Sequence, residues 1–89
     1  MEDTIIDCTQ IHSREDLHRI FREALGFPAC YGSNLDALHD CLTDISEPVR
    51  IRLLNWDAAE KSLGNYARST KRAILDAAVH NPNLAVIFE

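Results

Sequence analysis

The sequence contains no lysine or arginine between Arg22 and Arg50. The acidic residues inside this gap are Glu23, Asp36, Asp40, Asp44 and Glu47. A segment with several acids and no bases should carry a negative local potential, and such a potential speeds association with basic partners. The whole chain has 14 acidic residues against 9 lysines and arginines, a formal net charge of -5. Because contacts with phosphates require clustered Lys and Arg, this balance argues against direct binding to nucleic acid.

Features of secreted and membrane proteins are also missing. The first eight residues, MEDTIIDC, are acidic where a signal peptide is positive, and no apolar run approaches the roughly 18 residues of a membrane span. The three cysteines lack CxxC spacing, which fits neither a disulfide framework nor a zinc knuckle. We therefore expect a cytoplasmic protein with reduced thiols and no membrane contact. Cys8 and Cys41 fall in apolar segments and should be buried, whereas Cys30 falls in a loop.

The chain is long enough for one hydrophobic core. Its 89 residues bury roughly 60 to 65% of the unfolded surface, so we expect a single domain over residues 1–89. Hydrophobic periodicity and end signals predict seven elements. In chain order they are a strand at Thr4–Cys8, a helix from Ser13 to Gly26, a helix capped by Ser33 or Asn34 and ending near Thr43, a strand at Val49–Leu54, a helix at 56–63 capped by Asn55 and ended by Gly64, a helix from Tyr66 to about His80, and a strand at Leu84–Phe88.

The order of these elements predicts the α/β class. Strands joined by helical crossovers imply a parallel sheet with right-handed connections, so we expect a three-stranded parallel sheet packed with about four helices. The final run, LAVIF, is typical of a strand buried on both faces, whereas Arg50 and Arg52 indicate a solvated or salt-bridged face on the middle strand. The residues expected to face inward on the last helix are Tyr66, Ala73, Ile74, Ala77 and Ala78.

The helix that ends near Thr43 has one acidic face and one apolar face. At 100° per residue the acidic face carries Asp36, His39, Asp40 and Thr43, and the apolar face carries Leu35, Leu38 and Leu42. Like charges at i, i+4 cost a few tenths of a kcal/mol on an isolated helix, so the sequence accepts a small loss of stability here. From periodicity alone, an ordinary solvated face remains an open interpretation. Tyr31 and Gly32, directly before the helix, can add an aromatic ring and exposed backbone to the acidic row.

The segment YGSNLDALHDCLTD, preceded by ALGFP, closely resembles the barstar-like family, intracellular inhibitors of the ribonuclease barnase. The SREDLH helix start, the length of about ninety residues and the final apolar strand extend the resemblance along nearly the whole chain. The resemblance implies a three-stranded parallel α/β fold and a function without catalysis. In this family, the second helix and the loop before it plug the active site of a small basic ribonuclease, which is either a secreted enzyme or a delivered toxin. It implies a monomeric inhibitor without a cofactor.

The resemblance also implies which residues meet the enzyme. Asp40 would occupy the place of an RNA phosphate, with Asp36 as its flanking acid, and Asp76 would add a contact from the last helix. The full set of expected partner-binding residues is Cys30, Tyr31, Gly32, Asn34, Leu35, Asp36, His39, Asp40, Thr43 and Asp76. Aromatic residues of the family are replaced here by Cys30, His39 and Ile45. Because aromatic side chains are typical anchors of interfaces, their loss favours a cognate nuclease other than barnase, with a pocket reshaped around His39.

Two alternatives are kept beside this hypothesis. One is a barstar-like interaction module whose acidic face meets a basic partner that is not a nuclease. The other is a metal site at His39 with Asp36 and Asp40; Cys41 cannot join it, because positions 39 and 41 point about 200° apart on a helix. We expect no metal and no catalytic residue, since Cys30 has no positioned base. The remaining expectations are a packed Trp56, surface positions for His12, His18 and His80, and a solvated basic cluster of Arg68, Lys71 and Arg72.

Overall fold

The computed structural model describes residues 2–89, with side chains from Asp3 onward. In chain order the elements are β1 (Glu2–Asp7), the 3-10 helix η1 (Cys8–Gln10), α1 (Arg14–Leu25), α2 (Leu35–Thr43), β2 (Val49–Leu54), α3 (Trp56–Leu63), α4 (Asn65–His80) and β3 (Leu84–Phe88). Met1, the first residue of the expected single domain, lies outside the described residues. Within residues 2–89, no helix has the length and apolar character needed to cross a membrane.

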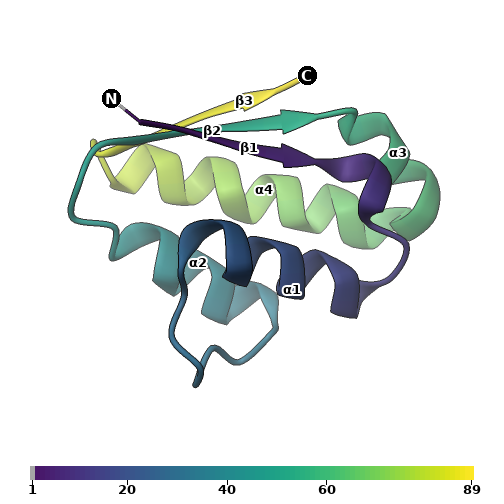
Figure 1. Cartoon of the computed structure of the whole chain (residues 1–89), viewed down its shortest axis with the longest axis horizontal. Helices are drawn as coiled ribbons and strands as arrows, with labels where there is room; N and C mark the ends of the chain where they lie inside the picture. Colours follow the sequence, from purple (N-terminus) through teal and green to yellow (C-terminus); the bar gives the residue numbers. More distant parts are fainter. Residues whose placement is uncertain (1) are drawn as a thin grey trace.

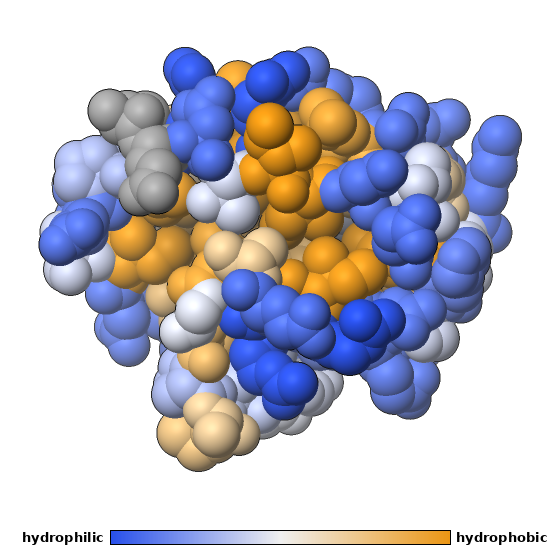
Figure 2. Space-filling model, viewed as in Figure 1, coloured by the Kyte–Doolittle hydropathy of each residue, from blue (hydrophilic) through white to orange (hydrophobic). Residues whose placement is uncertain are grey.

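The sheet is parallel throughout, with strand order β1-β2-β3. Helices α1, α2 and α4 lie together on one side of it, and α3 closes the end at which β2 finishes (Figure 1). The three parallel strands and four helices confirm the predicted α/β class. β1 forms one edge of the sheet, and Figure 2, in the same view, shows hydrophobic residues gathered over β1 and in the space between β1 and α1.

The prediction that β3 is buried on both faces is wrong, because the helices cover one face of the sheet only. Ile5, Arg52 and Ile87 are aligned side by side across the three strands. On this outer face Ile5 is 55% exposed and Ile87 is 40% exposed. Ile6 and Leu53, which alternate with them in sequence, are buried. The apolar run of β3 therefore belongs to a strand with one buried face and one solvent-exposed face, which we call the open face.

Two bidentate ion pairs cross the open face, as the salt-bridged alternative for β2 predicted. Arg50 donates to both carboxylate oxygens of Asp3 at 2.9 Å. Arg52 donates to the carboxylate of Glu89 at 2.7 and 3.1 Å. Planar guanidinium groups match carboxylates in this way, and the pairs tie β1 and the residue after β3 to the central strand.

The ends of several elements follow the predicted local rules, with two exceptions. Ser13 Oγ accepts from the backbone N–H of Asp16 at 3.1 Å, and Gly26 ends α1 in the left-handed region with φ 69°. Asn55 takes a left-handed conformation, and its side chain does not cap α3 as expected. Cys8 lies outside β1, because Asp7 Oδ1 accepts from the N–H of Thr9 at 3.0 Å and turns the chain into η1.

The core lies between the sheet and the helices. Its largest side chains include Phe21, Leu17 and Ile74, and Trp56 packs against Phe88 with ring centroids 5.1 Å apart, as the expected packing of Trp56 required. The inner face of α4 was predicted only in part: Ile74 and Ala77 are buried as expected, and Tyr66, Ala73 and Ala78 are half-buried flanks. The missed positions are Ala67 and Thr70. Thr70 is tolerated inside because its hydroxyl donates to the Tyr66 carbonyl at 2.7 Å.

Candidate protein-binding surface

Helix α2 exposes two carboxylates, Asp36 and Asp40, which we call the acidic row. The opposite side of the helix packs against the core. Leu38 and Leu42 are fully buried, and Leu35 packs half-buried against the same core, so the predicted apolar face is confirmed. Asp36 and Asp40 are exposed on the opposite side. Within residues 3–89, neither carboxylate forms a hydrogen bond or an ion pair. Two free carboxylates one helical turn apart are therefore available to a partner.

The start of α2 is fixed by its own loop. Asn34, rather than Ser33, caps the helix, since Asn34 Oδ1 accepts from the N–H of Ala37 at 2.8 Å. The same side chain donates to the carbonyl oxygen of Gly32 at 3.2 Å. A Cβ added at Gly32 would lie 3.2 Å from the Asn34 amide nitrogen, tighter than ordinary contact. The exposed residues Gly32 and Asn34 thus form a compact turn directly before the acidic row.

The end of α2 is fixed from a distant part of the chain. Asn81, which is buried between α4 and β3, directs its amide nitrogen at the carbonyl oxygens of Leu42 and Ile45, 2.9 and 3.0 Å away, and more distantly at that of Thr43. The last carbonyls of a helix have no partner within the helix, so this amide supplies what the helix lacks. The role of Asn81 was not predicted from the sequence. The available sequence signal is that Asn81 directly precedes Pro82. This position indicates the end of a helix but does not indicate which groups the side chain meets.

Tyr31 differs from the exposed aromatic residue that the sequence suggested. Its side chain is only 7% exposed and packs beside Phe27 with ring centroids 5.1 Å apart. The Tyr31 hydroxyl meets Nδ1 of His18, whose other ring nitrogen meets the Tyr66 hydroxyl at 2.7 Å. The expectation of a surface His18 is therefore wrong: this imidazole is 2% exposed, with both nitrogens satisfied. Burial lowers the pKa of His18 below its usual 6.5.

The other expected partner-binding residues lie around this helix with different exposure. Cys30 is exposed beside the Tyr31 loop, while Cys41 is half-buried. Thr43 is half-buried, and its hydroxyl donates to the carbonyl oxygen of Asp40 at 2.9 Å. Ile45, at the end of the helix, packs half-buried against the core. The surface around the acids is therefore mainly polar, with Cys30 and the edge of Leu35 as its apolar elements.

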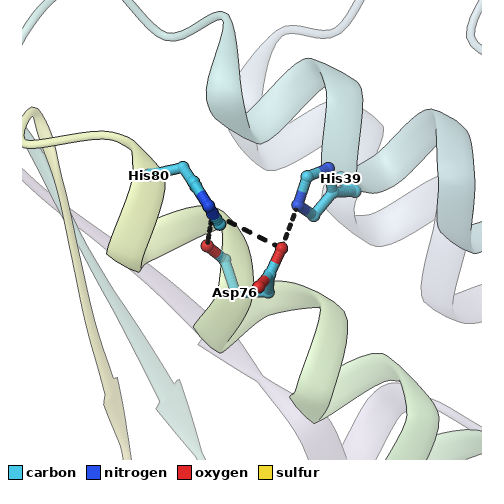
Figure 3. A group of neighbouring side chains, drawn as sticks. All are labelled: His39, Asp76 and His80. Carbon is cyan, nitrogen blue, oxygen red and sulfur yellow. Dashed lines mark hydrogen bonds and ion pairs between the residues drawn. The ribbon is translucent and has the colours of Figure 1, made fainter.

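Asp76 joins the acidic helix through His39. His39 Nε2 lies 2.7 Å from Asp76 Oδ2, which brings together α2 and α4 across 37 residues of sequence. His80, one turn farther along α4, donates from Nδ1 to the Asp76 carbonyl oxygen at 2.8 Å and lies 3.5 Å from the Asp76 carboxylate (Figure 3). The structure therefore makes Asp76 continuous with the α2 surface. His12 and His80 are exposed, as expected.

Basic residues border this surface, although sequence alone placed none nearby. Arg14, Arg19 and Arg22 of α1 line a hollow that also includes Ser33 and Asn34. Arg14 lies over the Tyr66 ring, 4.3 Å from its centroid. On α4, the expected basic cluster lines a second shallow hollow with Leu75, Asp76 and Val79. This surface therefore carries acids on the exposed side of α2 and bases along its margins on α1 and α4.

The fold is a small α/β fold, and helix α2 exposes Asp36 and Asp40 on its surface. Two comparisons with known proteins agree with that class. The model of the Barstar family, described as barstar (barnase inhibitor), matches residues 1–88. A protein of Bacillus subtilis (strain 168), named "Putative ribonuclease inhibitor YrdF", is 38% identical over 78 residues, which cover 86% of this chain and 86% of that protein. The chain belongs to the barstar family.

Proposed function

We propose that this protein inhibits a small basic ribonuclease by seating α2 and the preceding loop in the enzyme's active site, with Asp40 in the place of an RNA phosphate. The family match points to an inhibitor rather than an enzyme. The observation that carries the mechanism is the pair of exposed carboxylates, Asp36 and Asp40, which have no side-chain partner among residues 3–89 and lie on a helix held from both ends. Asp40 lies nearer the middle of the helix and takes the central position.

The chemistry of a ribonuclease cleft explains why carboxylates fit it. Such a cleft binds successive phosphates through lysine, arginine and histidine side chains, so a row of carboxylates can accept charge-assisted hydrogen bonds there. Binding costs less when the donor and acceptor groups are already ordered. The Asn34 cap, the buried leucines and the Asn81 amide provide that order before the enzyme arrives.

The replaced aromatic residues shape the choice of enzyme. Cys30 is exposed at one side of the acidic row, and His39 is half-buried and bonded to Asp76. A flat, polar imidazole-carboxylate pair suits a pocket with hydrogen-bond donors more than one built for large aromatic rings. The proposed target is accordingly a cognate nuclease other than barnase, either secreted or delivered as a toxin.

The test is affinity capture with the protein as bait, followed by an RNA-cleavage assay on the retained material. The source organism's lysate and culture fluid are passed over the wild type, over an Asp36→Asn, Asp40→Asn variant, and over an Asp57→Asn, Glu60→Gln variant. The last one is a matched control, because it removes the same charge from exposed positions of α3.

We expect the wild type and the α3 control to retain a basic ribonuclease and to silence it at a one-to-one ratio, and the α2 variant to do neither. A retained basic protein without nuclease activity would replace the proposal with the interaction-module alternative. A nuclease that stays active while bound, or that the α2 variant retains equally well, would show that the acidic row does not occlude an active site.

A further inference from the structure

Three metal-binding side chains converge where α2 crosses α4. His39 comes from α2, and Asp76 and His80 come from one face of α4, one turn apart (Figure 3). One nitrogen or oxygen ligand atom from each residue lies within 4.8 Å of the others. Within residues 3–89, no other group of three His, Cys, Asp or Glu side chains comes this close. From this convergence we propose that His39, Asp76 and His80 form a binding site for one zinc ion.

The ligand distances are near those that zinc requires. Zinc holds nitrogen and oxygen ligands at about 2.0 to 2.2 Å, so a tetrahedral site separates neighbouring ligand atoms by about 3.4 Å. His80 Nδ1 and Asp76 Oδ2 are already 3.5 Å apart. His39 Nε2 and Asp76 Oδ2 are 2.7 Å apart, so this pair must open by about 0.7 Å. A small rotation of exposed or half-exposed side chains supplies that movement without a change in the backbone.

The protons balance simply when the ion enters. His80 Nδ1 exchanges its hydrogen bond with the Asp76 carbonyl for the metal, and His39 Nε2 exchanges its hydrogen bond with the carboxylate in the same way. Each imidazole binds as the neutral ring, so the proton on the ligating nitrogen transfers through water to the other ring nitrogen. No lysine or arginine lies within 4.0 Å of the Asp76 carboxylate among the described residues, so the ion need not displace a cation.

The ligand set selects the class of ion. Two imidazole nitrogens and one carboxylate oxygen suit zinc and its neighbours, whereas Mg²⁺ and Ca²⁺ prefer sites made of oxygen alone. Three protein ligands leave a fourth position for water, and the exposure of Asp76 and His80 places that position toward solvent. The metal alternative predicted from the sequence joined His39 with Asp36 and Asp40, which are its neighbours within α2. The structure supplies the missing ligands from α4.

The frame around the site is already ordered. Asp76 and His80 are separated by one helical turn and therefore share a face of α4. The α2 backbone is held beside α4 by the buried Leu38 and Leu42 and by the Asn81 amide. An ion at this point would connect the two helices directly, so its binding should raise the stability of the folded protein. The proposal needs no partner protein and does not rest on the proposed inhibition of a ribonuclease.

The test is titration of the reduced, metal-free protein with Zn²⁺ alone, followed by calorimetry and by thermal unfolding. Co²⁺ is used in parallel as a spectroscopic probe. We expect one ion per chain, a rise in melting temperature, and a cobalt spectrum of four-coordinate type without thiolate charge transfer. His39→Gln and Asp76→Asn should each weaken zinc binding by at least about tenfold. Even substitution of a residue that only hydrogen-bonds to a metal ligand lowers metal affinity roughly 10- to 100-fold. His12→Gln is the matched control, since His12 is exposed and outside the cluster.

The design separates this site from the thiols and from unfolding. Cys30→Ser should bind Zn²⁺ as the wild type does. In the unaltered protein, Zn²⁺ should shift the imidazole nitrogen resonances of His39 and His80 and leave those of His12 and His18 in place. The dissociation constant expected of a three-ligand zinc site lies well below about 100 μM. Absence of one-to-one binding at that Zn²⁺ concentration therefore overturns the proposal. Binding that Cys30→Ser abolishes, or that Asp76→Asn leaves intact, overturns it as well.

Discussion

Nδ1 of His18, on α1, lies 2.5 Å from the hydroxyl of Tyr31, in the loop before α2. The second ring nitrogen of His18 meets the hydroxyl of Tyr66, on α4. A neutral imidazole has one N–H and one lone pair, so one tyrosine donates to the ring and the other accepts from it. This chain of polar contacts joins two helices to the loop that precedes the acidic row. Its strength depends on the charge of one buried ring.

Stability should fall below neutral pH because of His18. Burial lowers the pKa of this imidazole in the folded protein, while the unfolded chain takes up a proton near the usual value of 6.5. The stabilising contribution is therefore complete above about pH 6.5 and is lost as pH falls toward the folded pKa. One proton limits the slope to about 1.4 kcal/mol per pH unit. Urea unfolding between pH 7.5 and 5 measures it.

The matched variant for this prediction is His18→Gln, which keeps a donor and an acceptor but does not titrate. It should be less stable than the wild type at pH 7.5 and show a flatter dependence on pH. The carboxylates whose pKa is lowered, such as Asp3 beside Arg50 and Glu89 beside Arg52, titrate below this window. An unchanged slope in His18→Gln would mean that another group governs the acid sensitivity.

Removing the Asn81 amide should destabilise the protein. Asn81→Ala removes a buried amide that donates to the carbonyl oxygens of Leu42, Thr43 and Ile45, and at about 0.5 to 1.5 kcal/mol for each hydrogen bond the loss should cost about 1 to 3 kcal/mol of unfolding free energy. Asn81→Asp should cost at least as much, because it turns a carboxylate toward carbonyl oxygens. Asn65→Ala, at an exposed position on α4, is the control and should change little. Urea unfolding compares the three variants, and equal stability of all three would exclude a structural role for the amide.

The thiols should react in a defined order. Cys30 is exposed, Cys41 is half-buried with its pKa raised by burial, and burial raises the pKa of Cys8 to about 12. Because the thiolate is the reactive form, iodoacetamide should label Cys30 first and Cys8 only after unfolding. Mass spectrometry of the native protein over time gives the order. Cys30→Ser should lose the fast phase, and early labelling of Cys8 would show that its segment opens readily.

Local signals in the sequence were sufficient for most of the elements. The Ser13 cap, the left-handed Gly26 and the buried pair Leu38 and Leu42 each depend on residues within one or two turns of helix. The prediction that the final run, Leu84–Phe88, is buried on both faces was wrong. Composition alone does not show whether helices cover one face of the sheet or both. Ile87 is exposed since all three packed helices lie on the other side of the sheet.

Long-range partners account for what the sequence could not predict. His18 can be buried because tyrosine hydroxyls 13 and 48 residues away form hydrogen bonds with its two ring nitrogens. Hydrophobic periodicity gives no indication of such distant partners. Asn81 and the carbonyls of Leu42 and Ile45 that it meets are separated by more than 35 residues. The resemblance pointed to Asp76, but only the crossing of α2 and α4 shows that Asp76 meets His39 and His80.

Loss of the Asp40 charge should weaken binding to the proposed ribonuclease far more than loss of one charge elsewhere. A hydrogen bond to a charged group contributes about 1.5 to 3 kcal/mol, so Asp40→Asn should raise the dissociation constant by about 10- to 150-fold. Asp57→Asn, on α3, should leave it within about twofold, because an exposed charge outside the interface contributes only through screened, long-range attraction.

The wild type and the Asp36→Asn, Asp40→Asn double variant should also respond differently to salt. Association of the wild type should slow as ionic strength rises, because the Debye length falls from about 10 Å at 0.1 M to about 3 Å at 1 M and screens the attraction between the acidic row and a basic cleft. Asp36→Asn, Asp40→Asn should associate more slowly at low salt and depend on salt less steeply. Stopped-flow measurements with the purified nuclease resolve this difference. Parallel salt dependences for wild type and double variant would place the attracting charges outside α2.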